Sequence, residues 1–465
     1  MNPKQFKEFL CKTTLTCREK DKAWKLYKKE SSLKALEFIE KVEIPDPSLQ
    51  QLKSPVPWKI WGEHQIEKEA LEQMQKAASL PVALAAALMP DAHMGYGLPI
   101  GGILATENSV IPYAVGVDIA CRMKISIYAN LAEILKDSQN STYSLLYTAL
   151  LNNSLFGSGP QGMHAGKIEH PLLEKEHWQF SSLAGSLRQT AIHQIGTSGG
   201  GNHFVEWGIL EISTADNLLN LAQGKYLALL SHSGSRGVGF KIANYYTKIA
   251  MARLKDLDSS VKHLAWLPLD QDIGQESWQS MHLAGEFAAA FHEVIHQRIS
   301  TTIGLTPLAT VENPHNFAWK EKIFIDGKEK EAIVHRKGAT PAGKGVLGII
   351  PGTMADPGYV VIGKGHRESL NSASHGSGRK MARSRAKKVI SPKQYRDYLS
   401  QHGVDLIGGT IEEAPQAYKA IFQIMEEQKD LVDILGIFQP KIVRMASQEN
   451  MHSSAKLPFG IIEGE

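Results

Sequence analysis

Four histidines stand where an imidazole is free to do chemistry. Each either follows an apolar run or lies among glycines and serines, which bury too little apolar surface to anchor a core. They are His203 in GTSGGGNHF, His232 in LLSHSGSRG, His315 in VENPHNFAW and His375 in SASHGSGR. The segments around His232 and His375 look alike, and the question is whether the two histidines have the same role.

GVDIAC adds a carboxylate and a thiol, Asp118 and Cys121. Carboxylate, thiolate and imidazole donors suit a divalent transition metal such as Mn, Zn, Co or Ni, and a thiolate can bridge two ions. The donors are scattered along the chain, so their spacing alone leaves a set of structural histidines and a buried cysteine as an equal alternative. For His282, His292 and His296, in a predicted helix, a satisfied or surface histidine is the favoured interpretation.

Glycine-rich loops recur along the chain. Such loops bring main-chain N–H groups close to a phosphate without a Cβ in the way. They are PIGG (99–102), GTSGGGN (196–202), SHSGSRG (231–237), PGTMADPG (351–358) and HGSGR (375–379). None is a Walker A or GxGxxG motif. Singly each is an ordinary turn, but together they favour a polyphosphate ligand, and the arginines of two loops suit phosphate oxygens.

A basic strip, GRKMARSRAKK, follows His375 directly, and HRKGATPAGKG (335–345) is a second basic segment. Cations next to a catalytic loop can follow a nucleic-acid backbone, and the alternative is a solvated helix face. The cations are Arg379, Lys380, Arg383, Arg385, Lys387 and Lys388, with Arg336, Lys337 and Lys344 in the second segment.

The composition is that of a protein with a sizeable core. Of 465 residues 43% are hydrophobic, the formal net charge is +3 and only three cysteines occur. No disulfide framework or signal peptide is evident, and the longest apolar run, residues 80–89, is too short to cross a bilayer. We therefore expect a soluble cytoplasmic protein, with a weak preference for a monomer.

Strand-like and helical segments are interleaved, which predicts an α/β class, or α+β with a mixed sheet. A helical extension is expected over 1–50, a catalytic domain over 51–450 and a tail over 451–465. Predicted helices cover 58–78, 130–151, 243–254 and 278–300, and predicted strands include 226–230, 332–335 and 359–362.

Taken together, these motifs resemble the RtcB family of RNA-splicing ligases. PDAHMGYGLPIGG, GVDIAC, GTSGGGNHFVE, SHSGSRGVG, HNFAWKE, HRKGATPA, PGTM, SASHGSGRKM and EEAPQAYK occur in that family's order, over roughly residues 57 to 445. The resemblance implies one α/β catalytic domain that uses GTP and two Mn²⁺ ions. It implies an enzyme that joins RNA 3′-phosphate or 2′,3′-cyclic phosphate ends to 5′-hydroxyl ends through a covalent histidine–GMP intermediate.

The resemblance also implies roles for individual residues. Metal ligands would be Asp118, Cys121 (as the bridge), His203, His232 and His315, and His375 would carry GMP. The expected nucleotide site comprises Asn202, Glu206, Asn316, Pro351, Gly352, Thr353, Met354, Gly376, Ser377, Gly378, Arg379, Tyr418 and Arg444. Expected RNA contacts are Arg236, Arg336, Lys337, Lys380 and Arg383.

The chain departs from the family at several points. Ala120 and Arg122 stand where glycines are usual, Pro357 and Gly358 replace a serine-containing run, and Arg444 is the nearest match to a terminal lysine. AAAFHEVIHQRI also replaces a helix end that usually holds A-x-x-Asn-Arg. These departures favour a divergent branch acting in RNA repair. The alternatives are an enzyme that caps 3′-phosphate ends with GMP but seals poorly, a non-catalytic RNA-binding relative and a metal-dependent phosphoesterase.

Overall fold

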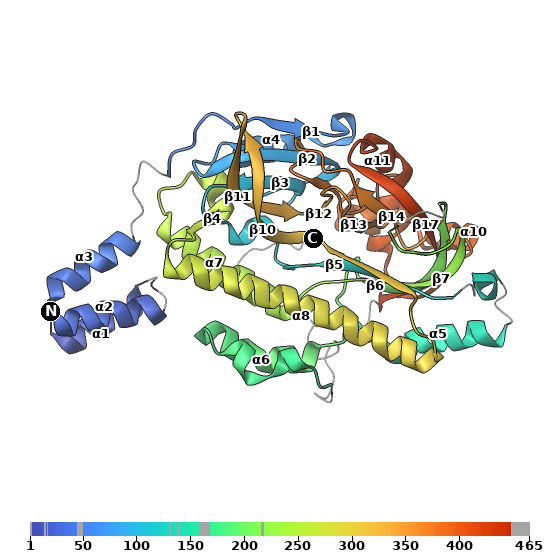
Figure 1. Ribbon diagram of the computed structural model, residues 1–465, viewed down its shortest axis with the longest axis horizontal. Coiled ribbons are helices and arrows are strands. Elements are labelled where there is room, and N and C mark those ends of the chain that lie inside the picture. Colours follow the sequence, from blue (N-terminus) through green and yellow to red (C-terminus); the bar gives the residue numbers. More distant parts are fainter. Residues whose placement is uncertain are drawn as a thin grey trace.

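The structure, a computed structural model, places a layer of helices across one face of a large sheet and packs a second sheet beside it (Figure 1). It describes residues 2–13, 15, 17–43, 50–129, 132–136, 140–157, 168–214 and 218–447. Helices and strands alternate along the chain, and the sheets contain both parallel and antiparallel pairs. The predicted mixed α/β class is confirmed.

The largest sheet has eight strands, and its neighbours are antiparallel except for β16 and β17. Side chains therefore alternate between its faces: Val205 and Trp207 join the core under the helical layer, whereas Phe204 and Leu210 join the core on the opposite face. In order the strands are β13 (Leu347–Ile350), β14 (Gly358–Gly363), β17 (Val432–Ser447), β6 (Phe204–Ile212), β7 (Gly224–Ser233), β5 (Arg122–Ile127) and β9 (Ala309–Pro314), with β16 (Asp405–Gly409) paired to β17.

The second sheet has five strands, and two short ribbons connect it to the first. Its order is β1 (Trp58–Ile60), β2 (Ala83–His93), β3 (Ile100–Thr106), β11 (Lys328–Lys337) and β10 (Asn316–Ile325). The ribbons are β12 (Ala339–Pro341) with β15 (Ser372–Ser374), and β4 (Ser109–Val110) with β8 (Leu267–Pro268).

Helices pack on the faces of both sheets. The long α8 runs under the large sheet in Figure 1, and its chain reverses at Gly304, whose φ of 67° is the left-handed conformation that glycine favours at a helix end. The helical layer comprises α5 (Ser141–Asn153), α6 (Ser182–Gln194), α7 (Arg236–Arg253) and α8 (Asp272–Ile303). Packed elsewhere are α4 (Lys68–Ala78), α9 (Arg383–Val389), α10 (Pro392–Gln401) and α11 (Ile421–Glu427).

Three N-terminal helices form a module at one end of the molecule (Figure 1). They are α1 (Pro3–Lys12), α2 (Cys17–Lys29) and α3 (Ser32–Glu43). Their apolar residues form a core of their own, in which the rings of Phe6 and Tyr27 stack 4.3 Å apart. The module lies within the extension predicted over 1–50, whereas the tail predicted over 451–465 lies outside the described residues.

Most predicted elements are present, with different bounds. The helix expected over 58–78 is wrong in its first part, because residues 58–60 pair with β2 as strand β1 and the helix spans only residues 68–78. The helix expected over 130–151 is α5, at 141–153, and α8 is longer than predicted at both ends. Among the described residues, no helix combines the length and apolar character needed to cross a bilayer.

Candidate metal centre

The ends of four adjacent strands bring the predicted metal ligands together. Asp118 and Cys121 come just before β5, His203 just before β6, His232 near the end of β7, and His315 just after β9. Because the order β6-β7-β5-β9 is antiparallel, these ends share one edge of the sheet. The sheet thus gathers donors that are up to 197 residues apart in the chain.

The donor atoms lie within reach of common ions. Cys121 Sγ lies 3.4 Å from His203 Nε2 and 3.2 Å from His232 Nε2. His232 Nε2 is 3.2 Å from His315 Nε2, and His203 Nε2 is 3.1 Å from Asp118 Oδ2. Two donor groups result, Asp118–Cys121–His203 and Cys121–His232–His315, and Cys121 belongs to both.

The imidazole of His232 presents a lone pair to this cluster. Its Nδ1 lies 3.2 Å from the main-chain oxygen of Asn202, and since a carbonyl only accepts, Nδ1 carries the proton of the neutral ring. Burial, reinforced by neighbouring imidazoles, holds the pKa of His232 and of His315 well below the usual range. Both rings are therefore neutral at pH 7, the form in which imidazole binds a metal.

A strained turn separates two of the ligands. Ala120 adopts a φ of +57°, and its N–H donates to the Asn316 carbonyl at 2.6 Å. A left-handed conformation costs a residue with a Cβ about 1–2 kcal/mol. The strain explains physically why the family usually has glycine here, and the turn aims Asp118 and Cys121 at the same point.

The residues present fit a divalent transition metal. Each of the two groups offers three donor atoms within 4.8 Å of one another, and their thiolate, imidazole and carboxylate chemistry is the set that such ions prefer. The Nδ1 atoms of His203 and His315 have no hydrogen-bond partner among the described residues, so neither ring is oriented by a protein group on that side.

His375 lies against the metal centre on a different element. It follows β15, and its ring centroid is 5.1 Å from that of His315. Its Nδ1 lies 2.6 Å from Asp91 Oδ2, and its main-chain N–H donates to the same oxygen at 3.1 Å. Nδ1–H is thereby held by a carboxylate, which leaves the lone pair of the neutral ring on Nε2.

Asp91 is a site residue that sequence reasoning missed. It is fully buried in β2, and the ammonium of Lys419 donates to the carbonyls of Pro90 and Ala92 on either side of it, at 3.0 and 2.8 Å. Burial alone would raise the pKa of Asp91, but His375 and Lys419 bring it below its ordinary value. The available signal was a lone acidic residue at the end of the apolar run LPVALAAALMPDAH.

The predicted PGTM loop packs against the His375 segment. A Cβ on Gly376 would lie 3.2 Å from the Pro351 oxygen. Thr353 Oγ1 donates to Asp356 Oδ2 at 2.6 Å, and Tyr398 on α10 donates to Asp356 Oδ1 at 2.7 Å. Asp356, beside the Pro357–Gly358 departure, therefore fixes the loop to α10.

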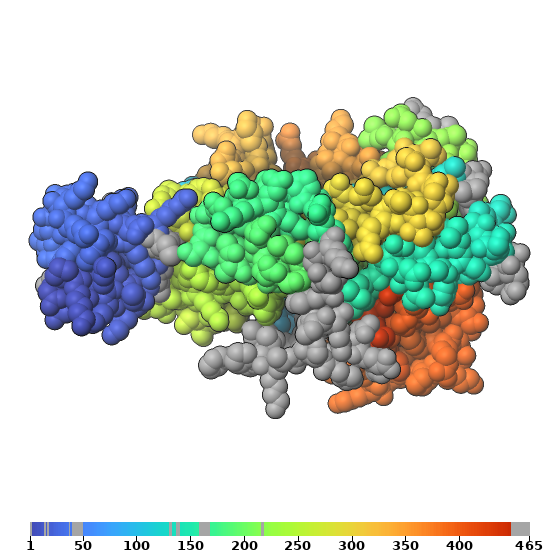
Figure 2. Space-filling view, turned by 90° about the horizontal axis from the view of Figure 1, so that it is seen from below, coloured from blue at the N-terminus to red at the C-terminus, as the bar shows by residue number. Residues whose placement is uncertain are grey.

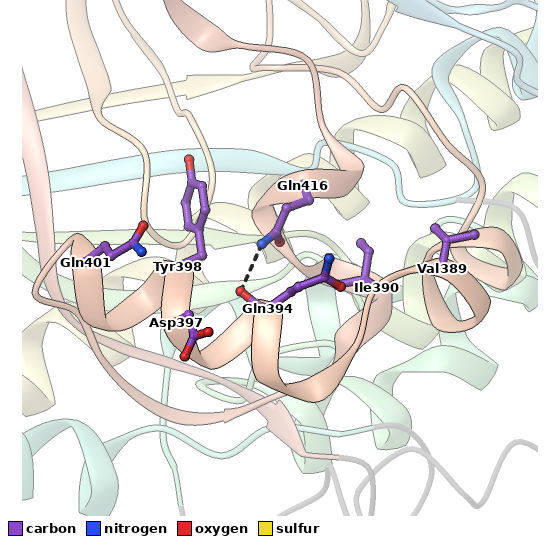
Figure 3. Close-up of a pocket in the computed structure, with 7 residues that line it drawn as sticks. All are labelled: Val389, Ile390, Gln394, Asp397, Tyr398, Gln401 and Gln416. Carbon is purple, nitrogen blue, oxygen red and sulfur yellow. Dashed lines mark hydrogen bonds between the residues drawn. The ribbon is translucent and has the colours of Figure 1, made fainter.

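A hollow of about 280 Å³ lies among residues at the end of α9, on α10 and at Gln416 (Figure 3). Figure 3 shows Tyr398 pointing away from Asp397, and Gln416 donating to the Gln394 carbonyl at 3.2 Å. The hollow is lined by Val389, Ile390, Gln394, Asp397, Tyr398, Gln401 and Gln416, none of which was predicted to act in catalysis.

Polar groups expected to face a nucleotide fall into two kinds. Asn316 is used internally: its Oδ1 accepts from the Gly338 N–H at 2.7 Å, and its Nδ2 donates to the Asp118 carbonyl. In contrast, Glu206 Oε2 and Ser377 Oγ are buried with no hydrogen-bond partner among the described residues. Burial raises the pKa of Glu206 well above its usual value.

Arg379 is engaged with protein groups. Its guanidinium donates to Glu413 Oε2 at 2.8 Å, to the Glu412 carbonyl at 2.6 Å and to the Tyr418 hydroxyl at 3.0 Å. Arg383 pairs with the other oxygen of Glu413 at 2.7 Å. That Arg379 and Arg383 contact phosphate stays a prediction. To do so, each arginine would have to bind the phosphate in addition to its carboxylate partner or in place of it.

Arg444 lies on the other face of the sheet from Glu206. Val443 is the partner of Glu206 in the register of β17 with β6, so the next side chain, Arg444, leaves the strand on the helical side. There its guanidinium donates to the Leu150 carbonyl at 3.0 Å, at the end of α5. To contact a nucleotide as predicted, the guanidinium of Arg444 would have to leave this position.

The structure corrects two of the predicted RNA contacts. Arg336 is fully buried, and its guanidinium is held by Glu321 at 2.6 Å and by Ser372 at 2.8 Å. Lys337 is 1% exposed, and its ammonium donates to the Tyr96 carbonyl at 2.8 Å. A phosphate backbone does not reach side chains that are buried in this way. Both cations instead make contacts inside the protein from a strand of the second sheet.

The other predicted RNA contacts are placed differently. Lys380 is exposed. Arg236, the first residue of α7, is half-buried and donates to the Gly157 carbonyl, and burial lowers its pKa to about 10, which leaves it charged at neutral pH. As RNA contacts, both residues stay predictions.

Two histidines of α8 form a buried chain behind β7. His292 Nε2 lies 3.0 Å from the Ser233 carbonyl, and its Nδ1 lies 2.6 Å from Ser231 Oγ. The same hydroxyl is 2.7 Å from His296 Nε2, whose Nδ1 is 2.7 Å from Ser126 Oγ. The interpretation of these histidines as satisfied helical residues is confirmed, and they hold the strand that carries His232.

Fold and donor set together define a mixed α/β protein with a cluster of residues that could hold a metal ion, flanked by a histidine whose Nδ1 is held by a carboxylate. The family model for tRNA-splicing ligase RtcB matches residues 73–445, and the chain belongs to the RtcB family. The chain is 29% identical over 404 residues to the RNA-splicing ligase RtcB of Escherichia coli strain K12, covering 82% of this chain and 95% of that protein. It is 28% identical over 465 residues to the tRNA-splicing ligase RtcB of Thermococcus kodakarensis, covering 84% and 94%.

Proposed function

We propose that this protein is a GTP- and Mn²⁺-dependent RNA ligase. It would join RNA 3′-phosphate or 2′,3′-cyclic phosphate ends to 5′-hydroxyl ends, in RNA repair, through a GMP carried by His375. Family membership supports the ligase class. The observation that carries the covalent step is the position of His375, whose Nδ1 is held by Asp91 while its ring lies next to that of His315.

His375 is the proposed nucleophile. Its Nε2 forms a bond to the α-phosphorus of GTP as the bond from that phosphorus to the β-phosphate oxygen breaks, and pyrophosphate leaves. The imidazole ring gains positive charge in this step, which the Asp91 carboxylate stabilises through Nδ1–H. The RNA 3′-phosphate then takes the GMP from His375, and the 5′-hydroxyl of the second strand displaces it.

Asp118, Cys121 and His203 would hold one Mn²⁺ ion, and Cys121, His232 and His315 the other. Bound there, the ions would neutralise charge on the phosphates and favour in-line attack. The shared position of Cys121 in the two groups supports its role as a bridge. The neutral imidazoles support a site ready to accept metal at pH 7.

Glu206 is the proposed reader of guanine. Guanine presents N1–H and a 2-amino group, both donors, to which a carboxylate is complementary and which adenine lacks in that pattern. The buried, unpartnered Oε2 of Glu206 supports this assignment. Binding of these donors would favour the ionised carboxylate and so offset the effect of burial on its pKa.

Incubation with α-³²P-GTP and Mn²⁺ tests the first step. We expect acid-labile, alkali-stable label on the wild-type protein and none on His375→Ala. Absence of label with any nucleotide defeats both the ligase and the capping enzyme, and leaves a non-catalytic RNA-binding relative or a phosphoesterase.

Addition of a 3′-phosphate RNA and a separate 5′-hydroxyl strand tests the second step. We expect a joined product. Accumulation of a GMP-capped strand with no joined product defeats the ligase and assigns the protein as a capping nucleotidyltransferase.

A further inference from the structure

Four cations form one stripe along α2 of the N-terminal module. Arg18, Lys22, Lys25 and Lys29 follow one another at spacings of four, three and four residues, and all are exposed. Residues spaced in this way lie on one face of a helix. We call these four residues the α2 stripe.

The cations of the α2 stripe form no salt bridges within the part of the chain that the structure describes. None of the four forms a salt bridge with a carboxylate of the described residues, although Asp21 flanks the stripe in sequence and the charge of Arg18 acts to lower the pKa of Glu276. Within the stripe, the ammonium group of Lys22 lies 5.0 Å from the ring centroid of Phe38. Exposed cations without a carboxylate partner are what the phosphate backbone of a nucleic acid binds.

A buried ion pair fixes the module to the body of the protein. Glu19 on α2 is paired with Arg253 at the end of α7 at 3.1 Å, and both side chains are 2% exposed. Arg253 also donates to Gln271 at 2.9 Å. The position of the α2 stripe relative to the metal centre is therefore set by a specific contact, and Figure 2 shows the module directly beside the body.

The helix that meets the module begins at the metal centre. Residues just before α7 touch Asp118, since a Cβ on Gly234 would overlap its carboxylate. The 18 residues of α7 span about 27 Å. Along α7, Lys241, Tyr245 and Lys248 are exposed at spacings of four and three residues. Two cations and an aromatic ring therefore lie on this helix between the metal centre and the N-terminal module.

We propose that the α2 stripe binds the phosphate backbone of the RNA substrate, several nucleotides from the end that reacts at the metal centre. This inference rests on the proposed function for the identity of the RNA as substrate. The stripe lies outside residues 73–445, which match the family. Contacts of this kind are sequence-independent and weaken steeply with salt, because each phosphate that is neutralised releases a counterion.

The test uses the full chain with Arg18, Lys22, Lys25 and Lys29 all changed to Gln. Glutamine removes the charge and keeps the helix propensity. The matched control changes Lys322, Lys328, Lys393 and Lys429 to Gln, which removes the same net charge from exposed lysines elsewhere. The probe is a fluorescein-labelled single-stranded RNA with a 3′-hydroxyl, which cannot react, and its anisotropy is followed over a salt series.

We expect the stripe variant to bind this RNA at least tenfold more weakly at low salt. The slope of log K against log salt should become shallower by about 0.7 for each phosphate that the protein no longer neutralises, so by about 3 if all four cations are engaged. The control should stay within about twofold of wild type. Normal labelling of the stripe variant by GTP shows that it is folded, since no stripe residue belongs to the catalytic machinery.

RNA affinity and slope equal to those of the control overturn the proposal. So does unchanged RNA binding combined with loss of a protein partner, which would make the stripe a protein-docking surface. His375→Ala separates the two hypotheses: it should abolish labelling and leave the salt slope intact. If wild type takes no label while the stripe still governs RNA binding, the ligase proposal fails and the RNA surface stands.

Discussion

The Nδ1 atom of His232 faces a main-chain carbonyl, whereas the Nδ1 atom of His375 faces a carboxylate. Both histidines lie in serine- and glycine-rich segments, SHSGSRG and SASHGSGR, that look alike in the sequence. Their supports differ in charge. A carbonyl fixes a tautomer and otherwise leaves the ring neutral, while a carboxylate also stabilises a ring that becomes positive.

This difference suits the roles proposed for the two residues, His232 as a metal ligand and His375 as the nucleophile. His232 must stay neutral and still, and a strand, a carbonyl and the buried chain behind β7 keep it so. In the proposed mechanism, His375 accepts and releases GMP and passes through a cationic state. Asp91 can stabilise that state because it is buried and ionised, and Lys419 donates to the carbonyls of Pro90 and Ala92 on either side of it.

The largest effect is expected from Asp91→Asn, which keeps the shape of the side chain and removes its charge. We predict that the rate of GTP labelling falls on the order of 10³-fold or more, by analogy with loss of the charge behind a catalytic histidine. Single-turnover labelling at saturating Mn²⁺ measures this rate. Labelling within about threefold of wild type would show that His375 needs only a hydrogen bond, as His232 does.

The control for Asp91→Asn is the pH dependence of the ratio of wild-type to variant labelling rates. The folded-state pKa of Asp91 is lowered, so its contribution to stability is present above the ordinary carboxyl pKa of about 3.9 and is lost only as the pH falls through the lower folded value. The ratio of wild-type to variant rates should therefore be flat across neutral pH. A ratio that changes there would assign the titrating group to another residue.

An intermediate effect is expected from Ser231→Ala, on the helical side of β7. Loss of the hydroxyl leaves His292 Nδ1 and His296 Nε2 without their partner, and unsatisfied buried groups cost about 1–3 kcal/mol each. We predict a loss of about 2–6 kcal/mol in the free energy of unfolding, measured in urea. Ser126→Ala frees His296 Nδ1 and removes a contact of the Tyr128 hydroxyl, which keeps Ser300 as a partner, so it should cost less. Equal costs would show that the chain does not act through Ser231.

The order of the motifs along the chain predicts this site better than the positions of the charged residues do. The four histidines, Asp118 and Cys121 come together because the donors lie at strand ends, where apolar runs meet glycine loops. Asp91 escaped notice because one aspartate in an apolar strand has no spacing that reveals its partner. That partner, His375, lies 284 residues further along the chain.

The two basic regions show why charge runs mislead. In the strip after His375, Arg379, Arg383 and Lys387 are paired with Glu412 and Glu413, which come from a segment some thirty residues later. The α2 stripe has no such ion pairs among the described residues. A sequence shows where cations are but not which are neutralised, because the carboxylates arrive through tertiary folding.

The smallest effect is expected from Asn202→Ala on the metal ligand that Asn202 supports. The contact to His232 Nδ1 is made by the main-chain oxygen of Asn202, which alanine retains. We predict that the Mn²⁺ concentration for half-maximal labelling stays within about twofold of wild type, even if the maximal rate falls through the proposed contact of the amide with nucleotide. A Mn²⁺ titration at saturating GTP separates the two quantities. A tenfold shift in the Mn²⁺ requirement would mean that the side chain of Asn202 helps to hold His232. The main-chain carbonyl alone would then not account for the position of His232, and the contrast with the carboxylate that supports His375 would fail.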